Sequence, residues 1–251
     1  MKNTQSNTSK VALVTGSSRG IGVAVAKRLA ADGFAVVVNY AGYAPDANAV
    51  VQEIQAGGGR ATAIQADVSS AAEVAAMFDQ VETVFGGMDV LINNAGIMQP
   101  GLVMLADTDD ALFDRMLAIN VKGTFNTLRL AAKRLRQGGR IDNFSSSVVG
   151  LAMPGYSVYA GTKSAVETMT SIFAKELRGR NISVNAVSPG PTATALFLKG
   201  KTEDQVAELA KMPPLERLGL PEDIAATVSF LVGPDGGWIN GQTIRPNGGI
   251  I

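Results

Sequence analysis

The sequence predicts an α/β fold in one domain: a doubly wound, parallel sheet of seven strands with helices on both faces. Two observations lead to this prediction. Short runs rich in Val, Ile and Ala alternate along the chain with longer helical stretches, which implies βαβ units with right-handed crossovers. Runs such as VALVT and AVVVN are also almost continuously apolar, as expected for strands covered on both faces in a parallel sheet.

The individual elements follow from this alternation in chain order. The strands are the short apolar runs, predicted at residues 11–15, 35–39, 61–66, 90–93, 140–144, 183–187 and 243–245. The helices are the longer segments between them, predicted at residues 20–31, 47–56, 71–85, 109–135, 156–177 and 222–231. No internal repeat, low-complexity tract or linker divides residues 10–251, so they form one domain behind a polar lead-in, residues 1–9, which we expect to be disordered.

Composition excludes several classes of protein. With 251 residues, 46% of them hydrophobic, the chain is large enough to bury the core of one α/β domain. Its 22 basic and 22 acidic residues balance, so neither nucleic acid nor a membrane is an expected partner. No run of about 18 apolar residues suits a transmembrane helix, and the polar start MKNTQSNTSK is unlike a signal peptide. The absence of Cys excludes disulfides and favours a cytoplasmic location.

The chain also lacks His. A Ser-His-Asp or Cys-His triad is therefore impossible, and without the usual nitrogen and sulfur ligands we expect no metal site. Acid–base chemistry must fall to Tyr, Lys, Asp or Glu. Tyr159 and Lys163, in the run YAGTK, are four residues apart and share one face of a helix. A phenol beside a fixed cation loses its proton more easily than its reference pKa of about 10 implies, which favours a general acid or base. A chance pair is the alternative interpretation.

The first predicted strand runs into the glycine-rich turn TGSSRGIG, residues 15–22, and a helix follows. This arrangement binds a pyrophosphate through backbone N–H groups and the helix dipole, and glycines allow the close approach of the backbone. The spacing is G-x-x-x-G-x-G rather than the G-x-G-x-x-G of the general dinucleotide motif. A plain glycine turn is the alternative.

The end of the second predicted strand indicates which nicotinamide cofactor binds. A carboxylate there would bind a ribose 2′-hydroxyl and repel a 2′-phosphate, but this chain has Asn39, followed by Tyr40 and Ala41. Arg19 lies in the glycine-rich turn, where a guanidinium is suited to grip a phosphate with two hydrogen bonds; a solvated surface arginine is the alternative. We therefore predict NADP(H) rather than NAD(H).

TGSSRGIG, NNAG at 93–96, INVKG around Asn120 and YAGTK occur in an order that resembles the short-chain dehydrogenase/reductase family. The later runs SPG at 188–190, RLGLPEDIA at 217–225 and GQTIRPNGG at 241–249 are most similar to its 3-oxoacyl-[acyl-carrier-protein] reductases and related carbonyl reductases. The resemblance implies a Rossmann fold and a homotetramer. Its interfaces would involve the long helices around Asn120 and Tyr159 and the C-terminal strand with Trp238 and Ile239.

The resemblance also implies four catalytic roles. Tyr159 would protonate the substrate oxygen, and Lys163 would lower the pKa of Tyr159 and hydrogen-bond the nicotinamide ribose. Ser146 would polarise the carbonyl, although the adjacent Ser147 is an alternative because Ser145, Ser146 and Ser147 are consecutive. Asn120 would kink its helix and hold a water in a proton relay to Lys163.

The remaining site residues are likewise implied by the resemblance. Asp67 and Val68 would flank the adenine, Asn93 would support the central strand, and the segment 191–214 would close over the substrate. The expected cofactor contacts are Gly16, Ser18, Arg19, Gly20, Ile21, Gly22, Asn39, Tyr40, Ala41, Asp67, Val68, Asn94, Ala95, Gly96, Tyr159, Lys163, Pro189, Gly190 and Thr192. The expected substrate pocket is mainly apolar, with ordinary core packing as the alternative for each member: Met98, Ser146, Leu151, Met153, Tyr156, Leu196 and Phe197.

The predicted activity is NADPH-dependent reduction of a ketone carbonyl, in a 3-oxoacyl thioester or another apolar ketone, to a secondary alcohol. The cofactor supplies hydride, and the protein supplies position, polarisation and a proton from Tyr159. A polyol, sugar or steroid alcohol dehydrogenase working in the oxidative direction is an alternative, as is a non-catalytic NADP-binding sensor. One residue departs from the family pattern: Asp142 replaces a usually apolar residue, so we expect it at an exposed strand edge or beside a partner.

Overall fold

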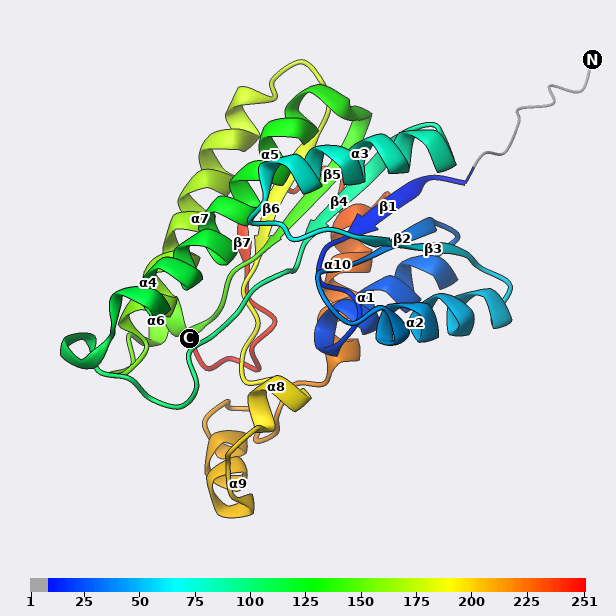
Figure 1. Cartoon of the computed structure of the whole chain (residues 1–251). Helices are drawn as coiled ribbons and strands as arrows, with labels where there is room; N and C mark the ends of the chain where they lie inside the picture. The colour runs from blue at the N-terminus through cyan, green and yellow to red at the C-terminus, as the bar shows by residue number, and fades with distance from the viewer. Residues whose placement is uncertain (1–8) are drawn as a thin grey trace, which may run out of the picture.

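The computed structural model describes residues 9–251, so all of the predicted lead-in except Ser9 lies outside the described residues. Seven parallel strands form one sheet in the order β3-β2-β1-β4-β5-β6-β7 (Figure 1). This confirms the predicted α/β fold class. The strands are β1 Val11–Val14, β2 Ala35–Tyr40, β3 Arg60–Gln65, β4 Met88–Asn93, β5 Leu135–Phe144, β6 Ser183–Val187 and β7 Thr243–Ile244.

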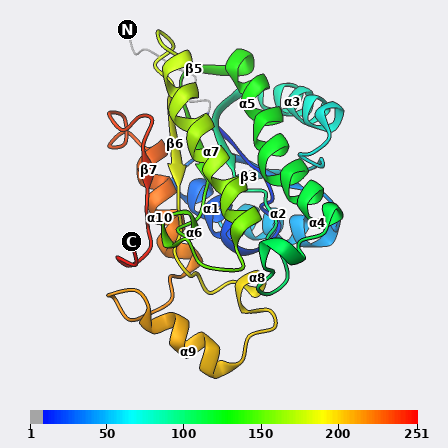
Figure 2. The same ribbon diagram turned by 90° about the vertical axis from the view of Figure 1, so that its left-hand side faces the viewer.

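Helices cover both faces of the sheet because each carries one apolar stripe. On one face α1 Gly20–Ala31, α2 Ala44–Ala56 and α10 Pro221–Val232 bury side chains such as Leu29, Val50 and Val228. On the other, α3 Ala71–Phe85, α5 Gly123–Arg134 and α7 Ser157–Glu176 contribute Val74, Leu128 and others. Figure 2 looks onto α7 and α5, which lie side by side along the sheet.

The predicted helix 109–135 is a composite in the structure. It consists of α4 Asp110–Met116, a π-helical segment Leu117–Lys122 and α5. The prediction was also wrong about its end, because Leu135 already begins β5. Short π-helical segments inside α-helices often occur at functional sites, and this one contains Asn120.

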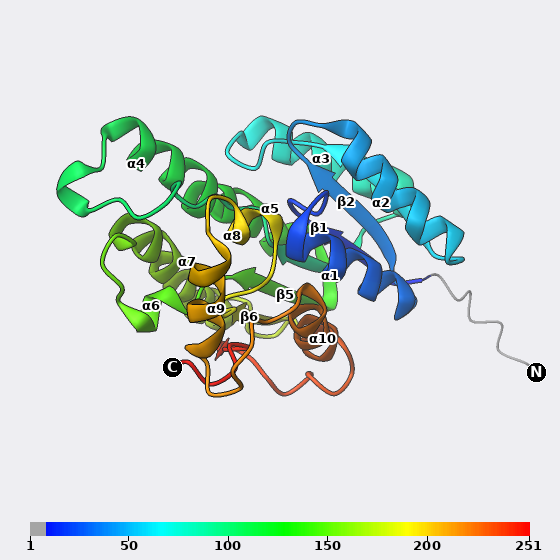
Figure 3. The same ribbon diagram turned by 90° about the horizontal axis from the view of Figure 1, so that it is seen from below.

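Between β6 and α10 lies a segment that packs loosely against the rest of the molecule. It contains α8 Ala195–Leu198 and α9 Glu203–Lys211. A capping box of Thr202 and Gln205 starts α9, yet within residues 203–211 no side chain is fully buried. Figure 1 shows α8 and α9 beyond the edge of the sheet where β6 ends, and Figure 3, seen from below, shows them in front of that edge. We call residues 191–214 the substrate segment, and the sequence analysis did not predict its two helices.

Two further short helices, Leu105–Asp107 (a 3-10 helix) and α6 Val148–Leu151, were also not predicted. None of the helices described between residues 9 and 251 has both the length and the apolar character that crossing a bilayer would need.

Asp142 contradicts its prediction, because it has neither an exposed position nor a partner for its charge. Its residue is 1% exposed in β5, between Ile92 of β4 and Asn185 of β6. Its Oδ2 atom has no hydrogen-bond partner among residues 9–251. Burial raises the pKa of the Asp142 carboxyl well above its usual value, and the charge of Arg140 offsets this only in part. The fold accommodates Asp142 by keeping it protonated.

We therefore predict a pH-dependent effect of Asp142→Asn. A carboxyl whose pKa is raised in the folded state contributes its full stability below the unfolded pKa of about 3.9. That contribution is lost as the pH rises through the folded value. An amide does not titrate, so Asp142→Asn should raise the free energy of unfolding by about 1–3 kcal/mol at pH 8 and change it little at pH 4.

Urea unfolding of wild type and variant between pH 4 and pH 8 measures this difference. Asp235→Asn is the control, because Asp235 is exposed in a loop. A difference that does not grow with pH would show that Asp142 is not held protonated in the folded protein.

Candidate active site

Four sequence motifs meet at one edge of the sheet. The glycine-rich turn follows β1, NNAG spans the end of β4, the three serines follow β5, and SPG follows β6. Because β1, β4, β5 and β6 are adjacent and parallel, their carboxyl ends open onto the same edge, where ligands of doubly wound sheets bind. The substrate segment with α8 and α9 lies at this edge (Figure 1).

The glycine-rich turn is held by side chains of two neighbouring strands. Gly16 N–H donates to Asn39 Oδ1 at 3.1 Å, and Asn94 Nδ2 donates to the carbonyl oxygens of Thr15 at 2.9 Å and Gly16 at 3.0 Å. At Gly22 a Cβ would lie 2.6 Å from both Asn94 Nδ2 and Gly16 O, so only glycine lets α1 approach the turn this closely.

The start of α1 is left open to an anion. Arg19 is its N-cap residue and makes no capping hydrogen bond with its side chain, so the first-turn N–H groups are available to a phosphate. Ser18 and Ile21 are partly buried beside them, and Arg19 and Gly20 are exposed. The geometry therefore suits a pyrophosphate.

The residues predicted to select a 2′-phosphate divide into two kinds. The Asn39 side chain is buried, and its Nδ2 donates to the carbonyl oxygens of Ala66 at 3.0 Å and Ile64 at 3.3 Å. Asn39 thus ties the turn to β3 and offers no free polar group. Arg19 and Ala41 are exposed, and Tyr40, the last residue of β2, is partly buried. Of these residues Arg19 is the one whose charge is free to meet a 2′-phosphate.

On the adenine side, Asp67 forms a turn in which its Oδ1 accepts from Ser69 N–H at 2.9 Å and Ser69 Oγ at 2.8 Å. Val68 is buried, and its carbonyl oxygen accepts from Asn126 Nδ2 at 2.9 Å. These contacts fix the backbone of the predicted adenine-binding turn to α5.

Tyr159 and Lys163 lie one turn apart on α7, as predicted. Lys163 is 4% exposed, its Nζ donates to Phe144 O at 2.9 Å, and Nζ lies 5.7 Å from the centre of the Tyr159 ring. The ammonium is therefore fixed at the end of β5, beside the ring of Tyr159.

The three consecutive serines have different partners. Ser145 Oγ donates to Glu167 Oε1 at 2.6 Å, and Ser147 Oγ donates to Ser188 O at 3.0 Å. The hydroxyl of Ser146 instead hydrogen-bonds Tyr159 and thereby lowers the pKa of the phenol. Of the three, Ser146 has the hydroxyl that faces the candidate acid.

The expectation that Lys163 acidifies Tyr159 is not met in the protein alone. Burial raises the pKa of Tyr159 to about 12; the hydrogen bond with Ser146 lowers it and the nearby Tyr156 raises it. Burial also lowers the pKa of Lys163 to about 8. Desolvation disfavours both charged forms, and the ammonium of Lys163 is bonded to a backbone carbonyl. Tyr159 therefore keeps its proton at neutral pH.

Asn120 is buried in the π-helical segment, and both ends of its amide are bonded. Its Oδ1 accepts from Ile97 N–H at 2.8 Å, and its Nδ2 donates to Ile97 O at 2.9 Å and to Thr162 Oγ1 at 3.1 Å. A Cβ on Gly96 would lie 3.3 Å from both Asn120 Oδ1 and Lys163 Nζ. The two groups therefore flank Gly96, and the predicted water relay between them stays a prediction.

The predicted substrate residues come from three segments at this edge. Met98, Leu151, Met153 and Tyr156 are partly buried, and Gln99 Nε2 ties their two loops together by donating to Gly155 O at 2.8 Å. On α8, Phe197 is partly buried and Leu196 is 56% exposed. Residues 188–192 follow β6; the family resemblance predicts them beside the nicotinamide, and we call them the nicotinamide loop. Pro189 and Thr192 are buried there, and Thr192 Oγ1 donates to Gly190 O at 2.9 Å.

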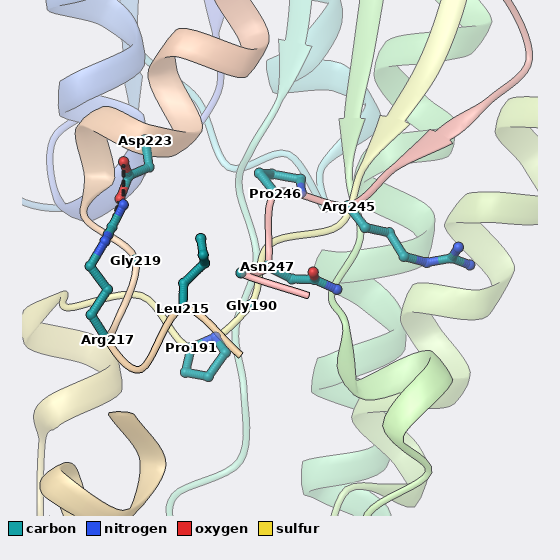
Figure 4. A pocket seen from close by; sticks show the side chains of 10 residues that line it. Gly190, Pro191, Leu215, Arg217, Gly219, Asp223, Arg245, Pro246 and Asn247 are labelled. Atoms are coloured by element: carbon teal, nitrogen blue, oxygen red, sulfur yellow. Dashed lines mark hydrogen bonds and ion pairs between the residues drawn. The ribbon is translucent and has the colours of Figure 1, made fainter. Parts of the chain in front are cut away.

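A pocket of about 250 Å³ adjoins this edge (Figure 4). Gly190 and Pro191 line it, together with the Arg217–Asp223 ion pair and residues 245–248. Ser146, Tyr159 and Lys163 do not line it. Residues 9–251 contain no group of three or more Asp or Glu side chains arranged to hold a metal ion.

Comparison with known proteins places this arrangement in a family. A family model described as enoyl-(acyl carrier protein) reductase matches residues 16–250. The chain is 44% identical to a chloroplastic NADPH-dependent aldehyde reductase-like protein of Arabidopsis thaliana, over 96% of this chain and 94% of that protein.

Solved structures agree with this match. A short-chain dehydrogenase of Burkholderia cenocepacia J2315 in complex with NADP is 41% identical, with a TM-score of 0.89 over 96% of this chain and 97% of that one. The promiscuous reductase LugOII, which catalyses keto-reduction at C1 during lugdunomycin biosynthesis, is 35% identical, with a TM-score of 0.90 over 97% and 98% of the two chains.

The chain belongs to the short-chain dehydrogenase/reductase family. It is therefore an oxidoreductase, as the motifs predicted. The roles that membership implies for Tyr159, Lys163, Ser146 and Asn120 stay predictions about this chain.

Three residues of this short-chain dehydrogenase/reductase were missed by sequence reasoning although they contact the predicted site. Thr162 bonds Asn120, Glu167 bonds Ser145, and Asn247 donates to Ser147 Oγ at 3.1 Å. Thr162 and Glu167 lie within one helical turn of Lys163, which is a usable signal in hindsight. Asn247 is 100 residues from its partner, so only the folded chain shows the contact.

The different partners of the serines lead to a prediction. Ser146→Ala should lower kcat about 100-fold, because one polarising hydroxyl is lost where charge develops. Ser147→Ala should lower it about tenfold or less, because Ser147 contacts only protein groups. Single-turnover kinetics with NADPH measures both variants, and NADPH affinity should be unchanged in each. The reverse order of effects would transfer the catalytic role to Ser147.

Proposed function

We propose that this chain catalyses the NADPH-dependent reduction of a ketone carbonyl to a secondary alcohol, with Tyr159 as the general acid. The proposal is carried by the placement of three groups at the end of β5. Lys163 Nζ donates to Phe144 O at 2.9 Å and lies 5.7 Å from the centre of the Tyr159 ring, and Ser146 is close enough to Tyr159 to lower the pKa of the phenol. These groups lie at the edge onto which the open start of α1 also faces. The hydroxyls of Ser146 and Tyr159 and the ammonium of Lys163 are the groups that carbonyl reduction needs, and this chemistry requires neither a metal nor His.

The cofactor is NADP(H). Relatives named for NADPH dependence or solved with NADP support this, and the residues of this chain fit the group. The uncapped start of α1 suits the pyrophosphate, Arg19 is exposed beside it, and Asn39 stands where a carboxylate would repel a 2′-phosphate. When bound, NADPH supplies the hydride for the carbonyl carbon.

Each catalytic side chain has one task in this proposal. Tyr159 keeps its proton at neutral pH because its pKa is raised to about 12, so it can donate that proton to the substrate oxygen. Ser146 hydrogen-bonds the same oxygen and polarises the carbonyl. Lys163, with a pKa of about 8, is charged near pH 7 and stabilises the phenolate that remains. Asn120 holds the loop that contains Ile97. It also holds a water in the relay through which Lys163 returns a proton to Tyr159.

An apolar carbonyl compound is the substrate class that the surroundings favour. Met98, Leu151, Met153 and Phe197 are partly buried at this edge, and methionines adapt to different substrate shapes. The names of the relatives, one aldehyde reductase-like and one a promiscuous keto-reductase, support a permissive reductase. A 3-oxoacyl thioester remains within this class.

The test follows NADPH oxidation with a panel of carbonyl compounds: an acetoacetyl thioester, a bulky aryl ketone, an aliphatic aldehyde, a sugar and a steroid. We expect turnover of several apolar members, and a loss of at least about 100-fold in Tyr159→Phe with NADPH binding retained. Tyr43→Phe, an exposed tyrosine, should have wild-type activity. NADPH binding without any turnover would favour a sensor, and turnover of alcohols alone would favour the oxidative alternative.

We also propose that the chain forms a homotetramer. Exposed apolar side chains fall into two groups. The first is on α4, α5 and α7: Phe113, Phe125 and Ile172. The second is on α10 and the C-terminal region: Phe230, Trp238 and Ile251. Trp238 is 98% exposed, which is costly for a side chain of its size. Two distinct self-complementary faces, each paired with a second copy, would give four subunits.

Light scattering should therefore give a mass about four times the 26.0 kDa of one chain. Ile172→Lys and Trp238→Lys each remove one face and should each give a dimer. A wild-type mass near that of one chain would refute the proposal. The cytoplasmic location stays a prediction.

A further inference from the structure

The last residues of the chain contact several loops of the candidate active site. We call residues 245–251 the C-terminal segment. Its Pro246 O accepts from Gly190 N–H at 3.1 Å, and its Gly248 O accepts from Leu215 N–H at 3.3 Å. Figure 4 shows Pro246 and Asn247 beside Gly190 and Leu215. The segment therefore joins the nicotinamide loop to the chain that leaves the substrate segment.

Asn247 links this segment to residues 145–150, the three serines and the start of α6, which we call the serine loop. It is 6% exposed, its Nδ2 donates to Ser147 Oγ at 3.1 Å, and its Oδ1 accepts from Gly249 N–H at 2.9 Å. Ser147 in turn donates its hydroxyl to Ser188 O at 3.0 Å and its N–H to Pro189 O at 2.9 Å. The Ser147 hydroxyl thus donates one hydrogen bond and accepts one, and both partners, Ser188 and Asn247, lie outside the serine loop.

The packing around Asn247 leaves little freedom. A Cβ on Gly190 would lie 2.8 Å from Asn247 Cα and 2.9 Å from its Cβ, so the nicotinamide loop can approach only because residue 190 is Gly. A Cβ on Gly150 of α6 would similarly lie 2.5 Å from Ile251 Cδ1. The C-terminal segment therefore closes against the serine loop at both of its ends, at Ser147 and at Gly150.

We infer that Asn247 is a positioning residue, which acts through Ser147 to hold the hydroxyl of Ser146 against Tyr159. This inference rests on the proposed function of Ser146 and Tyr159. Ser146 is partly buried, and its hydroxyl accepts from Val148 N–H at 3.4 Å. Its neighbours Ser145 and Ser147 donate their N–H groups to Val187 O and Pro189 O, so the place of Ser146 depends on the residues that flank it. Ser147 is anchored on one side by Ser188 and Pro189, which follow β6, and on the other by Asn247.

The consequence is a change in catalysis with little change in cofactor affinity. Without the Asn247 donor, Ser147 keeps one side-chain partner, and the short loop between β5 and α6 gains freedom. A displacement of a reacting group by about 1 Å costs up to about 100-fold in rate. Since Ser146 also lowers the pKa of Tyr159, its displacement would weaken the acid as well.

Two readouts test the inference in the full-length protein. In Asn247→Ala we expect about tenfold lower kcat, unchanged NADPH affinity, and about tenfold faster amide hydrogen exchange in residues 145–152. Ser147→Ala should give a similar kcat, and the double variant should lose no more than the larger single loss, because the two side chains act as one unit.

Asn240→Ala is the matched control. Its Oδ1 accepts from Val184 N–H at 2.9 Å, near the start of β6 and away from the serine loop. We expect it to leave kcat and the exchange of residues 145–152 unchanged, even if it lowers stability. This separates positioning from general destabilisation.

The inference is overturned if Asn247→Ala leaves exchange in residues 145–152 unchanged, if exchange rises without a fall in kcat, or if the effects of Asn247→Ala and Ser147→Ala on kcat multiply. Failure of the proposed function looks different. In that case the wild type reduces no carbonyl compound, and the exchange measurement still decides whether Asn247 holds the serine loop.

Discussion

A chain of buried hydrogen bonds between side chains connects the sheet to the helices that carry the proposed catalytic groups, and the geometry of the candidate site depends on this chain. Asn93 of β4 donates to Asn143 Oδ1 of β5 at 2.8 Å, and Asn143 donates to Thr170 Oγ1 of α7 at 2.9 Å. On the other side Thr127 of α5 donates to Asn93 Oδ1 at 2.7 Å. All four side chains are buried.

A satisfied network of hydrogen bonds in a low-dielectric interior is strong and specific, and a broken one leaves costly unpaired groups. It fixes α7, with Tyr159 and Lys163, and α5, which continues from Asn120, at defined positions over the strand ends.

The same low-dielectric interior sets the protonation states. Burial keeps Tyr159 and Asp142 protonated and brings the pKa of Lys163 down to about 8. For Tyr159 this outcome suits reduction, because a phenol that keeps its proton at neutral pH can give it to a developing alkoxide. For Asp142 we find no catalytic contact. It lies under α10, on the opposite face of the sheet from α7, and its neutral form is what the surrounding apolar side chains tolerate.

The edge of the sheet combines a rigid part and a loosely packed part. Asn39 and Asn94 hold the glycine-rich turn by hydrogen bonds, and the bonds of Ser147 with Ser188 O and Asn247 hold the serine loop to the nicotinamide loop and the C-terminal segment. The substrate segment has no fully buried residue in α9 and exposes Leu196 and Met212. Cofactor and acid–base groups need a fixed geometry, whereas a segment that closes over substrates of different shapes, as we propose for residues 191–214, needs freedom to adjust. The C-terminal segment contacts both parts.

Much of this protein was determined by local sequence alone. Alternating apolar runs predicted all seven strands, and spacing predicted the Tyr159–Lys163 pair and the glycine-rich turn, because each depends on residues close together in the chain. Asn39 and Asp142 show the limit: the sequence did not reveal that the Asn39 side chain is bonded to the backbone of Gly16, Ile64 and Ala66, and Asp142 was expected to be exposed or paired and is buried without a partner. The tertiary structure alone decided those environments, the different partners of the three serines and the contact of Asn247 with Ser147. Burial and hydrogen-bond partners depend on segments distant in sequence, and local pattern carries no information about which of them a folded side chain will meet.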